Sequence, residues 1–185
     1  MASASNIVTP PTEPIVVPDA PRGALAKSSW LTPTDLAAFS RLGIPLDLLL
    51  LAGVQRITDQ EAREKYGIRG PVSSDMSGIV FPYFSFVTGA RVTARLRRDN
   101  PEIEEGKEKN KYISAYGDRK HLYFPPGAAD KLQSPDAPIV LVEAEKSALA
   151  LTAWAERTAQ NLLAVAMGGC WGWRGRIGKR ENPTR

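Results

Sequence analysis

The sequence predicts a mixed α/β (α+β) fold, with helices first, a basic β-hairpin region next and a βαβ unit last. Helix-start signals dominate before residue 70, alternating apolar patterns follow, and a strand–helix–strand pattern begins at Pro138. A chain of 185 residues with 43% apolar and 24% charged residues has the composition of an ordinary globular protein. We therefore expect one main core, or one core with a small appendage.

The first part of the chain is predicted to be a leader followed by a helical subdomain. Residues 1–28 are rich in Pro, Ser, Thr and Ala without periodicity, which is typical of a disordered segment. Over residues 29–70, Thr32–Asp35 and Thr58–Glu61 are helix-start signals, and glycines at 43, 53 and 67 end the three expected helices. Scaffolding is the expected role of this subdomain.

Residues 71–135 are predicted to be a β-rich basic subdomain. Residues 78–87 form an expected strand, and 91–97 alternate strictly, with Val92, Ala94 and Leu96 on one face and Arg91, Thr93, Arg95 and Arg97 on the other. This pattern predicts a hairpin with an arginine-lined outer face. Residues 100–110 are expected to be a charged loop, and residues 111–116 and 121–124 two more short strands.

The arginines of this hairpin are candidate phosphate ligands. Alternate strand residues lie about 7 Å apart, which suits successive phosphates of a nucleic acid backbone. We assign this role to Arg91, Arg95 and Arg97. The alternative is an exposed sheet face whose charge is neutralised by the acidic residues between 102 and 108.

Residues 136–185 are predicted to begin with a parallel βαβ unit. An apolar strand at 139–142 ends in Glu143, a helix follows from Glu145 to about 158, and a second strand covers 162–166. Ligands of open α/β sheets gather at the carboxyl ends of the strands, so Glu143 is a candidate acid/base residue or Mg²⁺ ligand. The alternative for Glu143 is a polar strand end. Glu145 is interpreted as a charge that complements the helix dipole.

The last residues form a loop rich in glycine, tryptophan and arginine. Aromatic rings beside cations can stack bases and hold phosphates, as in single-strand binders. We assign this role to Trp173, Arg174 and Arg176. The alternative is that Trp171 or Trp173 packs under the helix, and we expect one of the two rings to be buried and the other exposed.

The composition also excludes several classes of site and location. One Cys and one His cannot form a self-contained zinc site or an intramolecular disulfide, which fits a reducing compartment. No apolar run has the length of a membrane span, and the N-terminus lacks the pattern of a signal peptide. We expect a cytoplasmic protein that does not enter membranes.

A family resemblance rests on several motifs in a fixed order. The strand that ends in Glu143 and the helix after it resemble the start of a toprim domain, the metal-binding module of bacterial-type primases and topoisomerases. Over residues 30–180 the chain resembles the toprim-like domain of phage- and plasmid-type primase and helicase proteins, a family of unknown function. The motifs are Phe81-Pro82-Tyr83, Gly89, Arg91, Arg95, Lys111-Tyr112-Ile113, Leu122–Pro125 and Gly169–Trp173.

The resemblance implies a role in DNA replication. It implies that Arg95 and Lys111 contact template or nucleotide phosphates, that Glu143 binds Mg²⁺ for nucleotidyl transfer, and that a replicative helicase is a partner. Ala144 and Ser147 stand where the family has Gly and Asp, and the chain contains no Asp-x-Asp. We therefore expect an incomplete metal site, with the C-terminal part of the toprim unit missing. Two alternatives remain open: a non-catalytic DNA-binding module, and a purely structural interaction domain.

Overall fold

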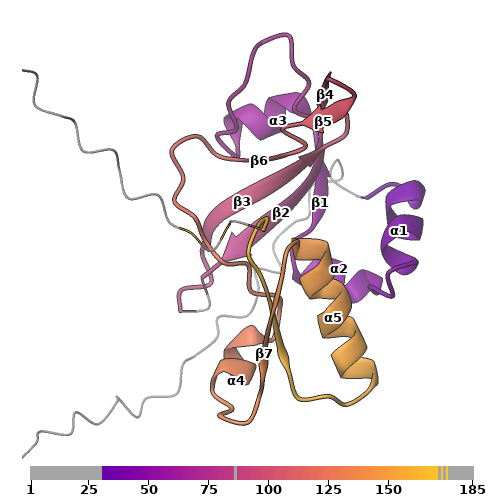
Figure 1. The fold of residues 1–185 in the computed structure, drawn as a ribbon, viewed down its shortest axis with the longest axis vertical. Coiled ribbons are helices and arrows are strands. Elements are labelled where there is room, and N and C mark those ends of the chain that lie inside the picture. Colours follow the sequence, from indigo (N-terminus) through magenta and orange to yellow (C-terminus); the bar gives the residue numbers. More distant parts are fainter. Residues whose placement is uncertain (1–30, 86, 171, 173, 175–185) are drawn as a thin grey trace, which may run out of the picture.

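The computed structural model describes residues 31–85, 87–170, 172 and 174. The described helices are α1 (Pro33–Ser40), α2 (Leu46–Leu51), α3 (Asp59–Glu64), α4 (Ala128–Leu132) and α5 (Glu145–Arg157) (Figure 1). The described strands are β1 (Gln55–Ile57), β2 (Gly78–Phe84), β3 (Arg91–Arg98), β4 (Glu102–Glu104), β5 (Lys107–Lys109), β6 (Tyr112–Ser114), β7 (Ile139–Val142) and β8 (Leu163–Ala166). None of these helices has the length and apolar character needed to cross a membrane.

The strands form an antiparallel sheet, a hairpin and a parallel pair. The antiparallel sheet has the order β1-β2-β3-β6, the hairpin is β4–β5, and the parallel pair is β7–β8 with α5 as its crossover. In Figure 1 the antiparallel sheet occupies the upper half of the molecule and the βαβ unit the lower half. The predicted mixed α+β class is confirmed.

Three details differ from the sequence-based expectation. Residues 102–109, expected to be a charged loop, form the β4–β5 hairpin, because Glu105 and Gly106 adopt the positive φ angles of a tight turn (51° and 73°). The expected strand at 121–124 is a single bridge between Tyr123 and Ala166. The short elements β1 and α4 were not predicted from the sequence, because they have too few residues to show a periodic pattern.

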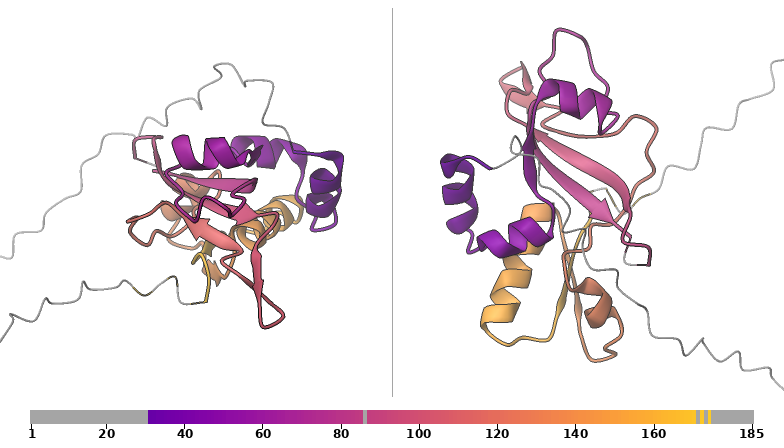
Figure 2. Two further views of the ribbon diagram at one scale, coloured as in Figure 1. Left: turned by 90° about the horizontal axis from the view of Figure 1, so that it is seen from above. Right: turned by 180° about the vertical axis from the view of Figure 1, so that it is seen from behind.

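Helices cover both faces of the antiparallel sheet, as the view from above in Figure 2 shows. One core joins α1, α2 and α5 to Ile79, Phe81 and Tyr83 of β2. The other core joins α3 to the opposite face, at Val80 and at the even-numbered residues of β3. The three helices between residues 33 and 64 therefore contribute to two different cores, and α5 packs against the same face of the sheet as α1 and α2.

An ion pair fixes α1 to the edge strand of the sheet. Thr32 and Asp35 form the predicted capping box at the start of α1. The Asp35 carboxylate also accepts two hydrogen bonds of 2.8 Å, from Nε and Nη2 of Arg56 in β1. The bonds from Arg56 lower the pKa of Asp35 from 3.8 to about 2.

This pair predicts a loss of stability in acid. Because the pKa of Asp35 is lower in the folded than in the unfolded chain, its contribution is present above pH 4 and is lost as the pH falls towards 2. The shift corresponds to about 2 kcal/mol. Urea unfolding at pH 6 and pH 2 should show this loss in the parent and a smaller pH dependence in Asp35→Asn. An exposed carboxylate, changed in Asp130→Asn, should leave the pH dependence as in the parent.

A candidate nucleic-acid interface at the carboxyl ends of β7 and β8

The carboxyl ends of β7 and β8 lie side by side at one edge of the βαβ unit. The two strands pair in parallel, with Val142 opposite Ala166. Beyond the last pair, the Met167 N–H donates to the Val142 carbonyl (2.9 Å) and the Gly169 N–H to the Glu143 carbonyl (2.8 Å). These bonds hold the two following loops together. The Glu143 side chain is exposed at this edge, as the sequence predicts for the end of a parallel strand.

The arginine face of β3 is turned towards this edge. Directly paired residues of antiparallel strands share a face, and Arg95 and Arg97 pair with Phe81 and Ile79 of β2. These two apolar residues pack in the core that contains α5. The prediction of a fully exposed outer face is therefore wrong: the arginine face lies on the side of the sheet that carries α1, α2 and α5, where Arg95 and Arg97 are only partly exposed. The side chain of Arg95 is only 16% exposed.

Arg91 lies on the opposite side of the sheet. The pairing of β2 with β3 is irregular at this point, where Val92 is an extra residue that interrupts the alternation. The Arg91 guanidinium lies 4.3 Å from the centre of the Tyr66 ring, which belongs to the core under α3. The expectation that Arg91 shares a face with Arg95 and Arg97 is wrong, because a strict alternation in the sequence does not reveal a bulge.

Glu145 is a buried acid that joins the two halves of the molecule. Its carboxylate is fully buried; Oε1 lies 3.2 Å from Nη1 of Arg95 and accepts a 2.5 Å hydrogen bond from the Tyr83 hydroxyl. The interpretation of Glu145 as a simple helix-dipole charge missed this role. A signal was present in the sequence: Glu145 precedes Ala148 and Leu149 by three and four residues, which places it on the buried face of α5.

Two tyrosines complete the surroundings of this acid. Tyr83 and Tyr123 pack edge to face, with ring centres 5.1 Å apart. Burial, and next the negative charge of Glu145, raise the pKa of both tyrosines well above 10. The Tyr83 hydroxyl therefore remains protonated and donates to Glu145. Among the described residues, the Tyr123 hydroxyl and Oε2 of Glu145 are buried without a hydrogen-bond partner.

The loop after β8 places Arg95 close to Glu143. The Arg95 guanidinium stacks on the Tyr112 ring, 4.6 Å from its centre. A methyl group at Gly168 would lie 3.5 Å from Nη1 of Arg95, and one at Gly169 would lie 3.7 Å from Nη2. Because Gly169 also bonds to the Glu143 backbone, the structure brings the predicted site residues Arg95 and Glu143 to one edge.

The other predicted site residues have different surroundings. Arg97 is partly exposed and has no carboxylate partner among the described residues. Lys111 forms a 2.5 Å ion pair with Glu108. Arg174 is exposed, whereas Trp171, Trp173 and Arg176 lie outside the described residues, so the expectation for the two rings stays a prediction.

The acids of the β4–β5 hairpin do not neutralise the arginine face in the described structure. Glu102 binds the buried Arg98, and the other two paired acids of the hairpin bind lysines within or next to it. No described carboxylate other than Glu145 pairs with Arg95. The ion pairs therefore contradict the alternative in which acids of the hairpin neutralise the arginine face.

The described residues do not fit a magnesium centre on their own. Mg²⁺ in proteins is usually held by one or two carboxylates together with waters and phosphate oxygens. Here Glu143 offers the exposed carboxylate, whereas Glu145 is buried and engaged by Arg95. No group of three His, Cys, Asp or Glu residues that could hold a metal occurs in the part of the chain that is described.

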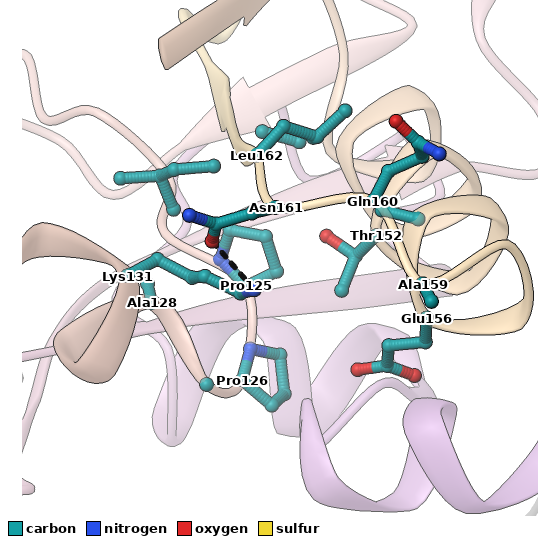
Figure 3. Close-up of a pocket in the computed structure, with 14 residues that line it drawn as sticks. Pro125, Pro126, Ala128, Lys131, Thr152, Glu156, Ala159, Gln160, Asn161 and Leu162 are labelled. Atoms are coloured by element: carbon teal, nitrogen blue, oxygen red, sulfur yellow. Dashed lines mark hydrogen bonds between the residues drawn. The ribbon is translucent and has the colours of Figure 1, made fainter. Parts of the chain in front are cut away.

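A pocket lies at the other end of the βαβ unit, next to the amino end of β8. It has a volume of about 240 Å³, and its polar lining includes Lys131, Thr152, Glu156 and Asn161 (Figure 3). The Lys131 ammonium donates one hydrogen bond to the Asn161 side-chain oxygen (3.0 Å). The volume is below the range typical of small-molecule sites, and the pocket is remote from the arginine face.

Comparisons with known proteins identify two similar folds. No protein-family model matches the chain, and no curated protein matches its sequence. The zinc-binding and RNA polymerase domains of the Aquifex aeolicus primase are similar in structure, with a TM-score of 0.49 and 16% identity over 72% of this chain and 36% of that one. A DnaG primase catalytic domain bound to ssDNA has a TM-score of 0.46 and 14% identity, over 73% of this chain and 49% of that one.

The chain thus spans less than half of either solved chain.

Proposed function

We propose that this chain binds nucleic acid through the arginine face of β3, at the edge where β7 and β8 end. One observation carries the proposal. Arg95, which stacks on Tyr112, lies next to the loop that follows the carboxyl ends of two parallel strands. A guanidinium has five N–H donors, and only Nη1 contacts Glu145. The N–H groups of Nη2 and Nε have no acceptor among the described residues, which leaves them available to phosphate oxygens.

The family resemblance suggests the wider role. We propose that the bound nucleic acid is DNA, that the chain acts in replication as a primase-type domain, and that a helicase is a partner. The exposed position of Glu143 favours a second proposal, in which this acid contributes to Mg²⁺-dependent nucleotidyl transfer once further ligands are supplied. Binding without catalysis is the function that the described residues support by themselves.

Salt-dependent DNA binding tests the proposal. In fluorescence anisotropy with a labelled oligonucleotide, Arg95→Ala combined with Arg97→Ala should lower the slope of log affinity against log salt by about 0.7–0.9 per lost phosphate contact. Arg97→Ala alone leaves the Glu145 ion pair intact and should lower the slope by about half as much. Lys107→Ala removes an exposed charge on the β4–β5 hairpin and is the matched control.

Glu143→Ala separates binding from metal chemistry. It should leave DNA affinity unchanged and abolish any Mg²⁺-dependent nucleotidyl transfer. If both arginine variants bind like the parent at every salt concentration, the proposed interface is wrong. If the parent does not bind DNA at all, the structural alternative is favoured.

A further inference from the structure

A second cationic surface lies on the α3 side of the sheet, away from the Arg95 site. It consists of Lys65, Tyr66, Arg69, Arg91 and Tyr116, and we call it the Tyr66–Tyr116 cluster. Lys65 caps the end of α3, and the Arg91 Nη2 donates to the Lys65 carbonyl (2.9 Å). The Tyr116 N–H donates to the Gly67 carbonyl (3.3 Å), which attaches the segment after β6 to this side.

The cluster is built from three contacts between cations and aromatic rings. Arg91 lies 4.3 Å and Lys65 5.7 Å from the centre of the Tyr66 ring. Apart from these contacts, Tyr66 is buried in the core. Arg69 lies 5.0 Å from the centre of the Tyr116 ring, and this ring is 76% exposed. Such contacts hold the flat guanidinium groups in place without consuming their charge.

The charges of the cluster are free to meet an anionic ligand. Lys65, Arg69 and Arg91 are all exposed, and none has a carboxylate partner among the described residues. Among the other described cations, Arg56, Arg63, Arg95, Arg98, Lys109 and Lys111 each pair with a carboxylate, whereas Arg97 and Lys107 do not. The carboxylate of Asp118 is engaged by the Thr93 hydroxyl. The surface therefore concentrates positive charge around an exposed aromatic ring.

We propose that the Tyr66–Tyr116 cluster binds single-stranded nucleic acid, as a continuation of the Arg95 site; this rests on the proposed function. Three cations provide contacts to phosphates, and the exposed Tyr116 ring, backed by Arg69, provides a platform for a base. Bases in a duplex have their faces stacked and cannot use such a platform. An acidic peptide would use the charges but not the ring.

The geometry of β3 connects the two surfaces. Arg91 precedes Arg95 by four strand residues, or about 13 Å, and faces the other side of the sheet. β6 pairs only with residues 95–97 of β3. Beyond β6 the chain crosses the open edge of β3, from Tyr116 on the α3 side to Asp118 at Thr93 on the other. A nucleic acid strand that follows this edge reaches both surfaces within a few nucleotides.

The experiment compares oligothymidines of two lengths, about 4 and about 16 nucleotides, which are the limits of the usual range of single-strand site sizes. Tyr116→Ala should weaken binding of the long oligonucleotide about fivefold or more and leave that of the short one unchanged. Tyr116→Phe keeps the ring and should bind both oligonucleotides like the parent. Arg69→Ala should weaken the binding of the long oligonucleotide and leave that of the short one unchanged. Lys107→Ala is again the charge control. A duplex of the longer length should show no loss with Tyr116→Ala.

The outcomes separate the cluster from the first site. If the parent binds both lengths and Tyr116→Ala and Arg69→Ala change neither, the inference is overturned while the proposed function stands. If Tyr116→Ala lowers duplex binding as much as single-strand binding, the proposed preference for single-stranded nucleic acid is overturned. If the parent binds no oligonucleotide, the proposed function itself fails. Both changes are at exposed side chains, so circular dichroism should show an unaltered fold.

Discussion

Glu145→Ala is expected to lower the free energy of unfolding by about 3–5 kcal/mol, because it removes one partner of a buried ion pair. The variant leaves the Arg95 guanidinium, whose side chain is only 16% exposed, and the buried Tyr83 hydroxyl without their carboxylate acceptor. Tyr83→Phe removes a single hydrogen bond to a buried carboxylate and should lower the free energy of unfolding by about 2 kcal/mol. Urea unfolding at neutral pH measures both changes.

Glu143→Ala is the matched control for this prediction. Glu143 lies two residues earlier and is exposed, so its removal should change the free energy of unfolding by less than about 0.5 kcal/mol. Equal effects of the two substitutions would show that the buried acid does not hold the halves together. Glu145→Leu also removes one partner and should destabilise, whereas apolar replacement of both Glu145 and Arg95 can be neutral or stabilising.

Gly78→Ala is expected to have a comparably large effect, because β2 and β3 approach each other closely at this residue. A Cβ at position 78 would lie 2.1 Å from the carbonyl oxygen of Arg97, and the φ angle of 157° is one that other residues rarely adopt. Either β3 moves or the pairing at this end of the sheet breaks. We expect a loss of more than about 3 kcal/mol in the free energy of unfolding, measured in urea.

A second glycine separates the two causes. Gly106 has a φ angle of 73°, and a methyl group there would meet nothing within 4 Å. Gly106→Ala should therefore show only the cost of the backbone angle, about 1 kcal/mol. If Gly78→Ala and Gly106→Ala lower the free energy of unfolding equally, close packing of residue 78 against Arg97 does not contribute to the effect. Because Arg97 belongs to the proposed interface, Gly78→Ala should also weaken DNA binding.

Local signals in the sequence predicted most of the elements correctly. Thr32 and Thr58 begin α1 and α3 with the expected capping boxes, since such a box is complete within four residues. The apolar run before Glu143 is β7, and the amphipathic stretch after it is α5. The parallel βαβ unit follows from these two elements and from the preference for right-handed crossovers.

The parts that the sequence did not predict depend on contacts between distant residues. Nothing in a single sequence links Glu145 to Tyr83, which lies 62 residues earlier. The face on which Arg91 lies depends on a bulge at Val92, which only the pairing with β2 reveals. The sequence did give one signal for the position of this face: the apolar residues on both faces of β2 are typical of a strand that is buried on both sides.

The long sequence separation around Glu145 also has a consequence for folding. Arg95 and Tyr83 precede this acid by 50 and 62 residues, so the three side chains meet only after large loops have closed. Closing such loops costs conformational entropy, which slows the formation of these contacts. The arginine face is complete only when the βαβ unit is docked on the sheet, so a ligand that requires the completed face stabilises this docking by mass action. Recognition and the docking of the two halves are thus thermodynamically linked in this molecule.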